Sequence, residues 1–147
     1  MARRMMQHWF RWTRSMTLGV RAMVIDAEGK ILLVRHGYTP GWLLPGGGIE
    51  RGETARQALA RELQEEAAIS LTEEPELFGL YSNEPIFPGD HVALYVVKRY
   101  APGRFAPTVE IVEARFFDPD CLPEDTSEGT RRRIDEVLRG KARAAHW

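Results

Sequence analysis

Three glutamates share one side of a predicted helix. Residues 55–67 contain no glycine, proline or β-branched residue, so nothing in this run interrupts a helix. At about 100° per residue, Glu62, Glu65 and Glu66 fall within one sector of that helix and repel one another. A divalent cation would turn this repulsion into attraction, and carboxylate oxygens suit Mg²⁺ or Mn²⁺ better than Zn²⁺. The alternative interpretation is a solvated helix face.

A glycine-rich segment precedes the helix and favours the metal-site interpretation. Gly46, Gly47 and Gly48 let the main chain approach a ligand closely, and their carbonyl oxygens can complete the ligand shell of a metal ion. Thr54 is the expected N-cap of the helix, and Gln57 three residues later completes a capping box. The N-terminus of the helix offers amide groups to a phosphate.

This segment resembles the signature of the Nudix hydrolases. The matching positions are Gly47, Glu53, Arg61, Glu62, Leu63, Glu65, Glu66 and Ile69. Ala68 stands where the family has glycine. Because that residue usually ends the helix in a left-handed turn, where alanine costs on the order of 1 kcal/mol, we expect a slightly altered helix end and an intact site.

The resemblance implies a role for each matching residue. Glu62, Glu65 and Glu66 would bind divalent cations, with the carbonyl of Gly46 as a further ligand; Mg²⁺ is the expected ion and Mn²⁺ the alternative. The catalytic set it implies is Glu53, Arg61, Glu62 and Glu66. Within that set, Glu53 and Arg61 form a supporting pair that holds the loop against the helix, and the general base is Glu62 or Glu66.

Other candidate residues lie outside the motif. A distal carboxylate often completes such a metal site; Glu110 and Glu113 are the candidates, and Glu113 is favoured because it precedes the run Arg-Phe-Phe. Arg35 follows a predicted strand towards the glycine-rich loop, which suits a phosphate contact or a solvated strand end. The residues placed where a base or sugar could bind, each with a structural alternative, are Tyr81, Asn83, Phe87 and His91.

The order of elements predicts an α/β (α+β) fold with a mixed β-sheet covered by helices, which is compatible with the α/β/α sandwich that the Nudix resemblance implies. We expect a hairpin of residues 18–24 and 31–34, a loop over 38–52, strands over 77–82, 91–100 and 109–118, and a second helix over 128–139. Residues 1–16 form a basic, aromatic segment expected to pack on the domain, and 17–147 a single Nudix domain. The alternatives for the N-terminal segment are docking to a membrane surface or a partner, or a transit peptide.

Composition narrows the function further. The chain has 147 residues and a net charge of −1, and this charge argues against a stable nucleic-acid complex. The sequence has no apolar run long enough to span a membrane. The single Cys121 favours a reducing compartment, so we expect a cytoplasmic protein; a homodimer is left open.

The expected activity is Mg²⁺-dependent hydrolysis of the pyrophosphate bond in a small molecule, a nucleoside diphosphate linked to another moiety. Pro85 lies sixteen positions after Ile69, which resembles the ADP-ribose-cleaving members of the family, and this resemblance favours ADP-ribose-like compounds or nucleotides as the substrate. The alternative is a Nudix-fold module that senses a nucleotide without cleaving it. Such a module would be expected to lose motif glutamates, whereas all three are present.

Overall fold

The computed structural model describes residues 15–84 and 86–147. Nearly all of the N-terminal segment, and Pro85, therefore lie outside the described residues. The elements are β1 (Thr17–Val24), β2 (Ile31–His36), β3 (Trp42–Leu43), β4 (Gly46–Gly48), α2 (Ala55–Ala67), β5 (Ile69–Leu71), β6 (Glu76–Ser82), β7 (Asp90–Val97), β8 (Tyr100–Pro102), β9 (Ile111–Phe117) and α3 (Glu128–Arg139).

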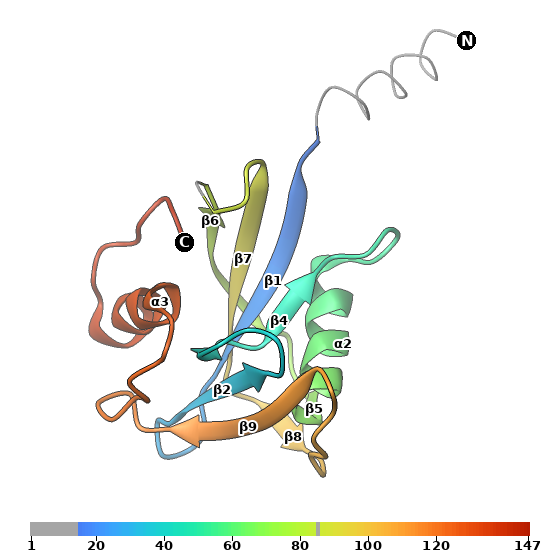
Figure 1. The fold of residues 1–147 in the computed structure, drawn as a ribbon, viewed down its shortest axis with the longest axis vertical. Coiled ribbons are helices and arrows are strands. Elements are labelled where there is room, and N and C mark those ends of the chain that lie inside the picture. Colours follow the sequence, from blue (N-terminus) through green and yellow to red (C-terminus); the bar gives the residue numbers. More distant parts are fainter. Residues whose placement is uncertain (1–14, 85) are drawn as a thin grey trace, which may run out of the picture.

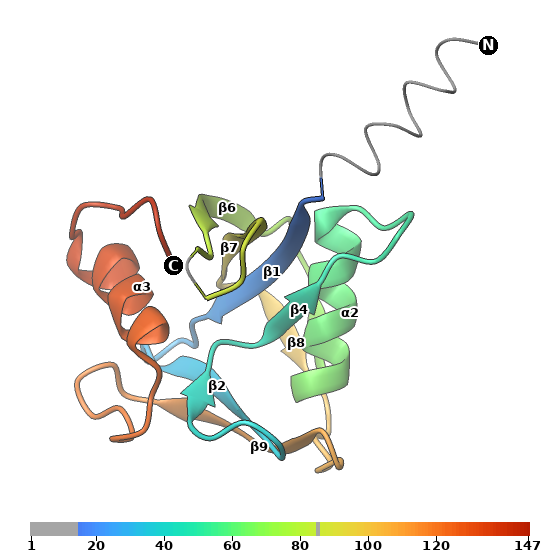
Figure 2. The same ribbon diagram turned by 45° about the horizontal axis from the view of Figure 1, so that its top comes forward.

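The strands form a mixed arrangement with a helix on either side (Figures 1 and 2). One sheet has the order β4-β1-β7-β6, a second has the order β3-β2-β9, and β5 pairs with β8. β1 and β7 are parallel, and the other pairs are antiparallel. The α/β fold with a mixed sheet and two helices confirms the predicted class.

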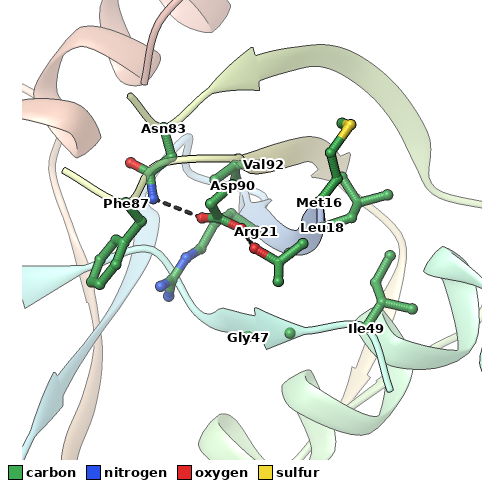
Figure 3. Close-up of a pocket in the computed structure, with 12 residues that line it drawn as sticks. Met16, Leu18, Arg21, Gly47, Ile49, Asn83, Phe87, Asp90 and Val92 are labelled. Carbon is green, nitrogen blue, oxygen red and sulfur yellow. Dashed lines mark hydrogen bonds between the residues drawn. The ribbon is translucent and has the colours of Figure 1, made fainter. Parts of the chain in front are cut away.

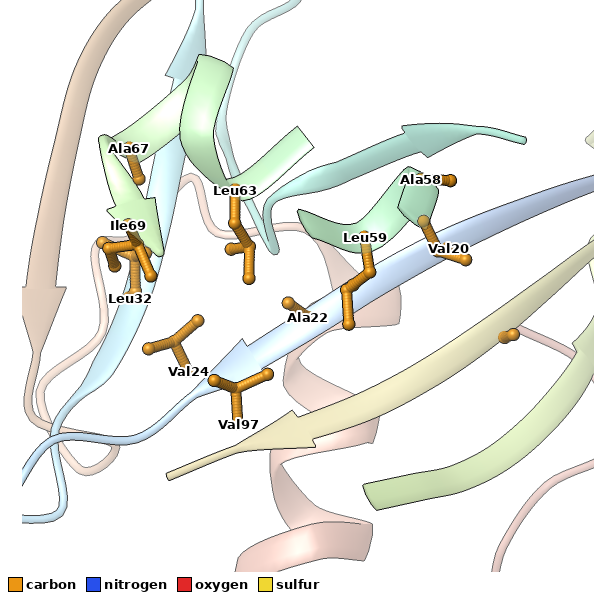
Figure 4. Close-up of a cluster of buried hydrophobic side chains, with 11 residues drawn as sticks. Val20, Ala22, Val24, Leu32, Ala58, Leu59, Leu63, Ala67, Ile69 and Val97 are labelled. Carbon is orange, nitrogen blue, oxygen red and sulfur yellow. The ribbon is translucent and has the colours of Figure 1, made fainter. Parts of the chain in front are cut away.

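Two hydrophobic clusters hold these layers together. The first joins α2 to β1, β7 and β2 (Figure 4), and includes Val20, Ala22, Val24, Leu59, Leu63 and Val97. The second joins the sheets to α3, and includes Met23, Leu33, Leu94 and Ile134. Since side chains alternate along a strand, Arg21 projects from the face of β1 opposite to Val20 and Ala22.

Both helices have the predicted bounds. Thr54 Oγ1 accepts a hydrogen bond from the Gln57 amide at 3.2 Å, and Gln57 Oε1 accepts one from the Thr54 amide at 2.8 Å, so the capping box is present. α3 ends at Gly140, which is left-handed with φ 65°. Ala68 ends α2 with φ 54° and ψ 38°. The helix therefore ends in the usual left-handed turn even though alanine replaces glycine, and the expected alteration is absent.

The predicted hairpin is wrong. β1 and β2 belong to different sheets, and a single bridge, Ile25 to Ile31, joins them beside the turn. The reason is that β4 and β7 take the two edges of β1. The predicted loop over 38–52 thus contains two short strands, β3 and β4, and the predicted strand over 91–100 is divided into β7 and β8. No helix among the described residues is long and apolar enough to cross a membrane.

Candidate active site

β4 contacts α2 through two glycines that have no room for a side chain. A Cβ atom on Gly46, whose φ is 147°, would lie 2.0 Å from the carbonyl oxygen of Val20. A Cβ atom on Gly47 would lie 2.4 Å from Oε1 of Glu62. Gly46 therefore lets β4 lie close to β1, and Gly47 lets the β4 backbone lie directly against Glu62 of α2.

Glu66 is the most buried of the three motif glutamates. Its side chain is 6% exposed, against 14% for Glu62 and 59% for Glu65. The Gly46 amide donates a hydrogen bond to its Oε2 at 2.8 Å. Burial raises the pKa of Glu66 to about 7, although the Gly46 amide and the nearby Arg21 oppose that shift. Burial also raises the pKa of Glu62, against the effect of Arg61.

Arg61 links the loop before α2 to the glutamates on it. Its guanidinium donates to both carboxylate oxygens of Glu53, at 2.7 and 3.1 Å, and to the carbonyl of Gly48 at 3.1 Å. It also donates to Glu62 at 2.8 Å and to Glu65 at 3.4 Å. The two bonds from Arg61 to Glu53 lower the pKa of Glu53 to about 2. The predicted contact between Glu53 and Arg61 is therefore present.

A cavity of about 490 Å³ beside α2 brings four carboxylates together. They belong to Glu62, Glu65, Glu66 and Glu110. The Gly37 amide donates to the Glu110 carbonyl at 2.8 Å and holds the turn before β9 in this position. Glu113 does not line this cavity, because it lies opposite Arg35 in the register of β2 and β9 and forms an ion pair with it. Glu110, the other candidate from the sequence, lines the cavity, so the geometry favours it over Glu113 as the distal carboxylate.

The three predicted substrate residues have different surroundings. Arg35 is half-exposed and is held by Glu113, with its guanidinium carbon 5.8 Å from the centre of the Trp42 ring. Tyr81 is 1% exposed, and its hydroxyl donates to Glu136 at 2.8 Å. Burial leaves Tyr81 little surface for a substrate contact, since the ring belongs to the core cluster beside α3. His91 is half-buried and does not line either of the cavities beside β4.

The residues around the 490 Å³ cavity fit a divalent cation by their chemistry. All four acidic side chains supply oxygen donors, the kind that Mg²⁺ and Mn²⁺ prefer. Gly47 leaves Glu62 the space that a Cβ atom would fill. The Gly46 carbonyl, predicted as a ligand, accepts a hydrogen bond from Arg21 at 3.1 Å. Across residues 15–84 and 86–147, no three acidic, histidine or cysteine side chains stand close enough to form a ready ligand set.

A second, larger cavity lies on the other side of β4. It measures about 690 Å³, and its walls come from the start of β1, from β4 and from the turn between β6 and β7 (Figure 3). Met16, Leu18 and Ile49 form an apolar wall, while Asn83, Phe87 and Asp90 gather at the opposite end. Gly47 lines this cavity and contacts Glu62 of the first one. Gly47 therefore lies between the larger cavity and Glu62 of the first one.

Four residues in or beside these cavities were missed or passed over in the sequence. Arg21 reaches the carbonyls of Leu44 and Gly46, at 2.9 and 3.1 Å; its one sequence signal is a charge within an apolar alternating strand. His36 Nε2 lies 3.6 Å from Glu66 Oε1, and its position directly after Arg35 was the available signal. Glu110 was the less favoured of two candidates. Asp90 gives no signal, because acidic residues are common in turns.

The comparisons with known proteins identify this arrangement. The model of the NUDIX domain matches residues 16–137. The chain belongs to the Nudix hydrolase family. The match covers β1 to α3 and both cavities, so the whole described site lies within the family's domain.

Several proteins resemble this Nudix chain along much of its length. An ADP-ribose pyrophosphatase from Methanocaldococcus jannaschii is 32% identical over 105 residues, which are 69% of this chain and 62% of that protein. A MutT-like protein from Streptomyces ambofaciens is 37% identical over 84% of this chain and 78% of its own. The crystal structure of a MutT NUDIX hydrolase from Burkholderia pseudomallei has a TM-score of 0.72 at 24% identity, covering 84% of this chain and 99% of that one.

Proposed function

We propose that this Nudix protein hydrolyses the pyrophosphate bond of a nucleoside diphosphate linked to another moiety, with Mg²⁺ as the expected ion. The observation that carries this proposal is the cavity lined by Glu62, Glu65, Glu66 and Glu110 beside the glycines of β4. Two of its relatives support the reaction class: an ADP-ribose pyrophosphatase and a putative 8-oxo-dGTP diphosphatase from Bacillus subtilis.

The glutamates would hold the cation, and the rest of the chain would hold the glutamates. A divalent cation, when bound, neutralises charge on the phosphate oxygens and lowers the pKa of water. Glu62, Glu65 and Glu66 are its proposed ligands, with Glu110 as the distal carboxylate. The five hydrogen bonds of Arg61 fix Glu62 and Glu65 relative to the loop at Glu53. Glu62 or Glu66 would take the proton from the attacking water.

The larger cavity offers room for the nucleoside. Gly47 lies between it and Glu62 of the carboxylate cavity, so we place the diphosphate beside α2 and the nucleoside between β1, β4 and the turn before β7. Arg35 stays a candidate phosphate contact, because it lines a third cavity of about 430 Å³ that shares Tyr38 with the carboxylate cavity. This division leaves His91 without a proposed role in substrate binding.

The test is a hydrolysis panel with the full chain. The substrates are ADP-ribose, NADH, diadenosine polyphosphates, nucleotide sugars and nucleoside triphosphates, each with and without Mg²⁺ or Mn²⁺. We expect metal-dependent cleavage of at least one compound. Glu66→Gln should lower kcat by about 100-fold or more, since a metal ligand or general base is lost while an oxygen remains to accept the Gly46 amide.

Glu73→Gln is the matched control, because it removes one exposed carboxylate distant from both cavities. This variant should retain the rate of the wild type. A wild type that binds nucleotides but cleaves none of the panel would replace the enzyme by the alternative, a nucleotide-sensing module.

A further inference from the structure

The far end of the larger cavity carries a carboxylate that no part of the metal site uses. Asp90 is half-buried at the first position of β7 and lines this cavity. Thr17 Oγ1 donates to its Oδ1 at 2.6 Å, and Asn83 Nδ2 donates to its Oδ2 at 2.8 Å. Both donors are neutral, so they orient the carboxylate without cancelling its charge. Each oxygen keeps a second lone pair for another donor.

The surroundings of Asp90 suit a flat ring. Phe87, whose side chain is 62% exposed, lies beside Asp90 and Asn83 at the same end of the cavity (Figure 3). The Asp90 amide donates to the Phe87 carbonyl at 3.1 Å, and the Asn83 amide donates to the Asp90 carbonyl at 2.9 Å. One turn thus presents an aromatic face and a pair of fixed acceptors together, which is the chemistry that stacks a base and reads its edge.

The charge of Asp90 restricts which base can bind. A carboxylate repels an anionic substrate unless the substrate offers it hydrogen-bond donors. Arg21 faces the same cavity, but its guanidinium is bonded to the carbonyls of Leu44 and Gly46. The group that contacts Asp90 therefore has to bring its own donors, and two parallel acceptors match two adjacent N–H groups.

Resting on the proposed function, we propose that Asp90 selects a nucleobase with two adjacent N–H donors on one edge, as guanine has at N1 and its 2-amino group. Thr17 and Asn83 act as positioning residues, because they hold the two carboxylate oxygens in place. Hypoxanthine offers N1–H alone and makes one of the two bonds. Adenine places the lone pair of N1 against the carboxylate, which is repulsive.

Binding of nucleoside monophosphates tests this assignment without any hydrolysis, since GMP, IMP and AMP contain no pyrophosphate bond. Calorimetry with the full chain should give the affinity order GMP, IMP, AMP, with GMP bound about tenfold or more tightly than AMP. Asp90→Asn should bring GMP and AMP within about threefold of each other. Asp118→Asn, an exposed aspartate outside the cavity, is the matched control and should keep the wild-type order.

The outcomes separate the base from the ribose and from the activity. Equal affinities for GMP and AMP in the wild type overturn the assignment, as does an order that Asp90→Asn leaves unchanged. Equal affinities combined with weaker binding of 2′-deoxy-GMP would assign Asp90 to the ribose hydroxyls instead. If the order holds but the hydrolysis panel is negative, the base assignment stands and the proposed enzyme activity falls. The affinity order of the wild type is measured without any variant, so this part of the test does not depend on whether a variant folds.

Discussion

At the scale of single residues, the site depends on which carboxylates form ion pairs with arginines and which ones face the carboxylate cavity. Arg61 engages Glu53, Glu62 and Glu65, and Arg35 engages Glu113. Glu113 pairs with Arg35 outside the carboxylate cavity, so it has less to gain from a metal ion there. Glu110, by contrast, faces the cavity that Glu62 and Glu66 share. Two glutamates three positions apart therefore have different surroundings.

This difference predicts that the two glutamates respond differently to the same substitution. Glu110→Gln should lower kcat about tenfold or more with the best substrate of the panel, because one charge near the cation is lost. Glu113→Gln should change kcat by less than about threefold, since it removes only a partner of Arg35. Steady-state kinetics across a Mg²⁺ titration measures both, and a larger loss for Glu113→Gln would favour Glu113 over Glu110 as the distal carboxylate.

At the scale of elements, the end of α2 is the least favourable backbone position among the described residues. Ala68 is the one non-glycine residue with positive φ in the part of the chain described. Its amide donates to the Gln64 carbonyl at 3.1 Å, and its carbonyl accepts the Gly103 amide at 2.6 Å. The amide bond is the last one of the helix, whereas the bond from Gly103 depends on the left-handed turn, so the fold keeps the turn despite its conformational cost.

Ala68→Gly should therefore stabilise the protein. Glycine adopts the left-handed conformation without the steric cost of Cβ, and it loses more backbone entropy on folding, so the net gain is about 1 kcal/mol or less. Urea unfolding, or a rise in Tm of about 2–4 °C, measures it. Ala60→Gly within the same helix is the matched control and should destabilise the protein by a similar amount. A loss of stability with Ala68→Gly would show that the turn costs less than we infer.

The ends of α2 also show what the sequence could predict. The helix bounds follow from local signals: the capping box at Thr54 and Gln57, and a run without helix-breaking residues. β3 and β4 are two and three residues long, and they exist because β2 and β1 offer backbone partners distant in sequence. No local pattern carries that information. The same limit applies to Glu110, whose place is set by contact with Gly37.

At the scale of the whole molecule, charged side chains gather in two separate places. Glu62, Glu65 and Glu66 of α2 line the carboxylate cavity on one side of the fold. On the other side, Arg133 of α3 is fully buried. It donates to Glu136 at 2.8 Å and to the His146 carbonyl at 3.0 Å, and its guanidinium lies 4.2 Å from the centre of the Tyr81 ring. This cluster ties α3 and the last residues to β6.

The cluster predicts a large loss of stability when its cation is removed. Arg133→Met should cost about 3–5 kcal/mol, because Glu136 stays buried without its partner. Adding Glu136→Gln should recover part of that loss, since the uncompensated charge is removed while oxygen remains for Tyr81 and the Ala144 amide. Urea unfolding at neutral pH compares the two variants.

Arg139→Met on the exposed side of α3 is the control and should lose far less stability, because the ion pairs of Arg139 with Asp120 and Asp135 are in solvent. Equal losses for Arg133→Met and Arg139→Met would mean that burial of the ion pair does not govern the stability of this side of the fold.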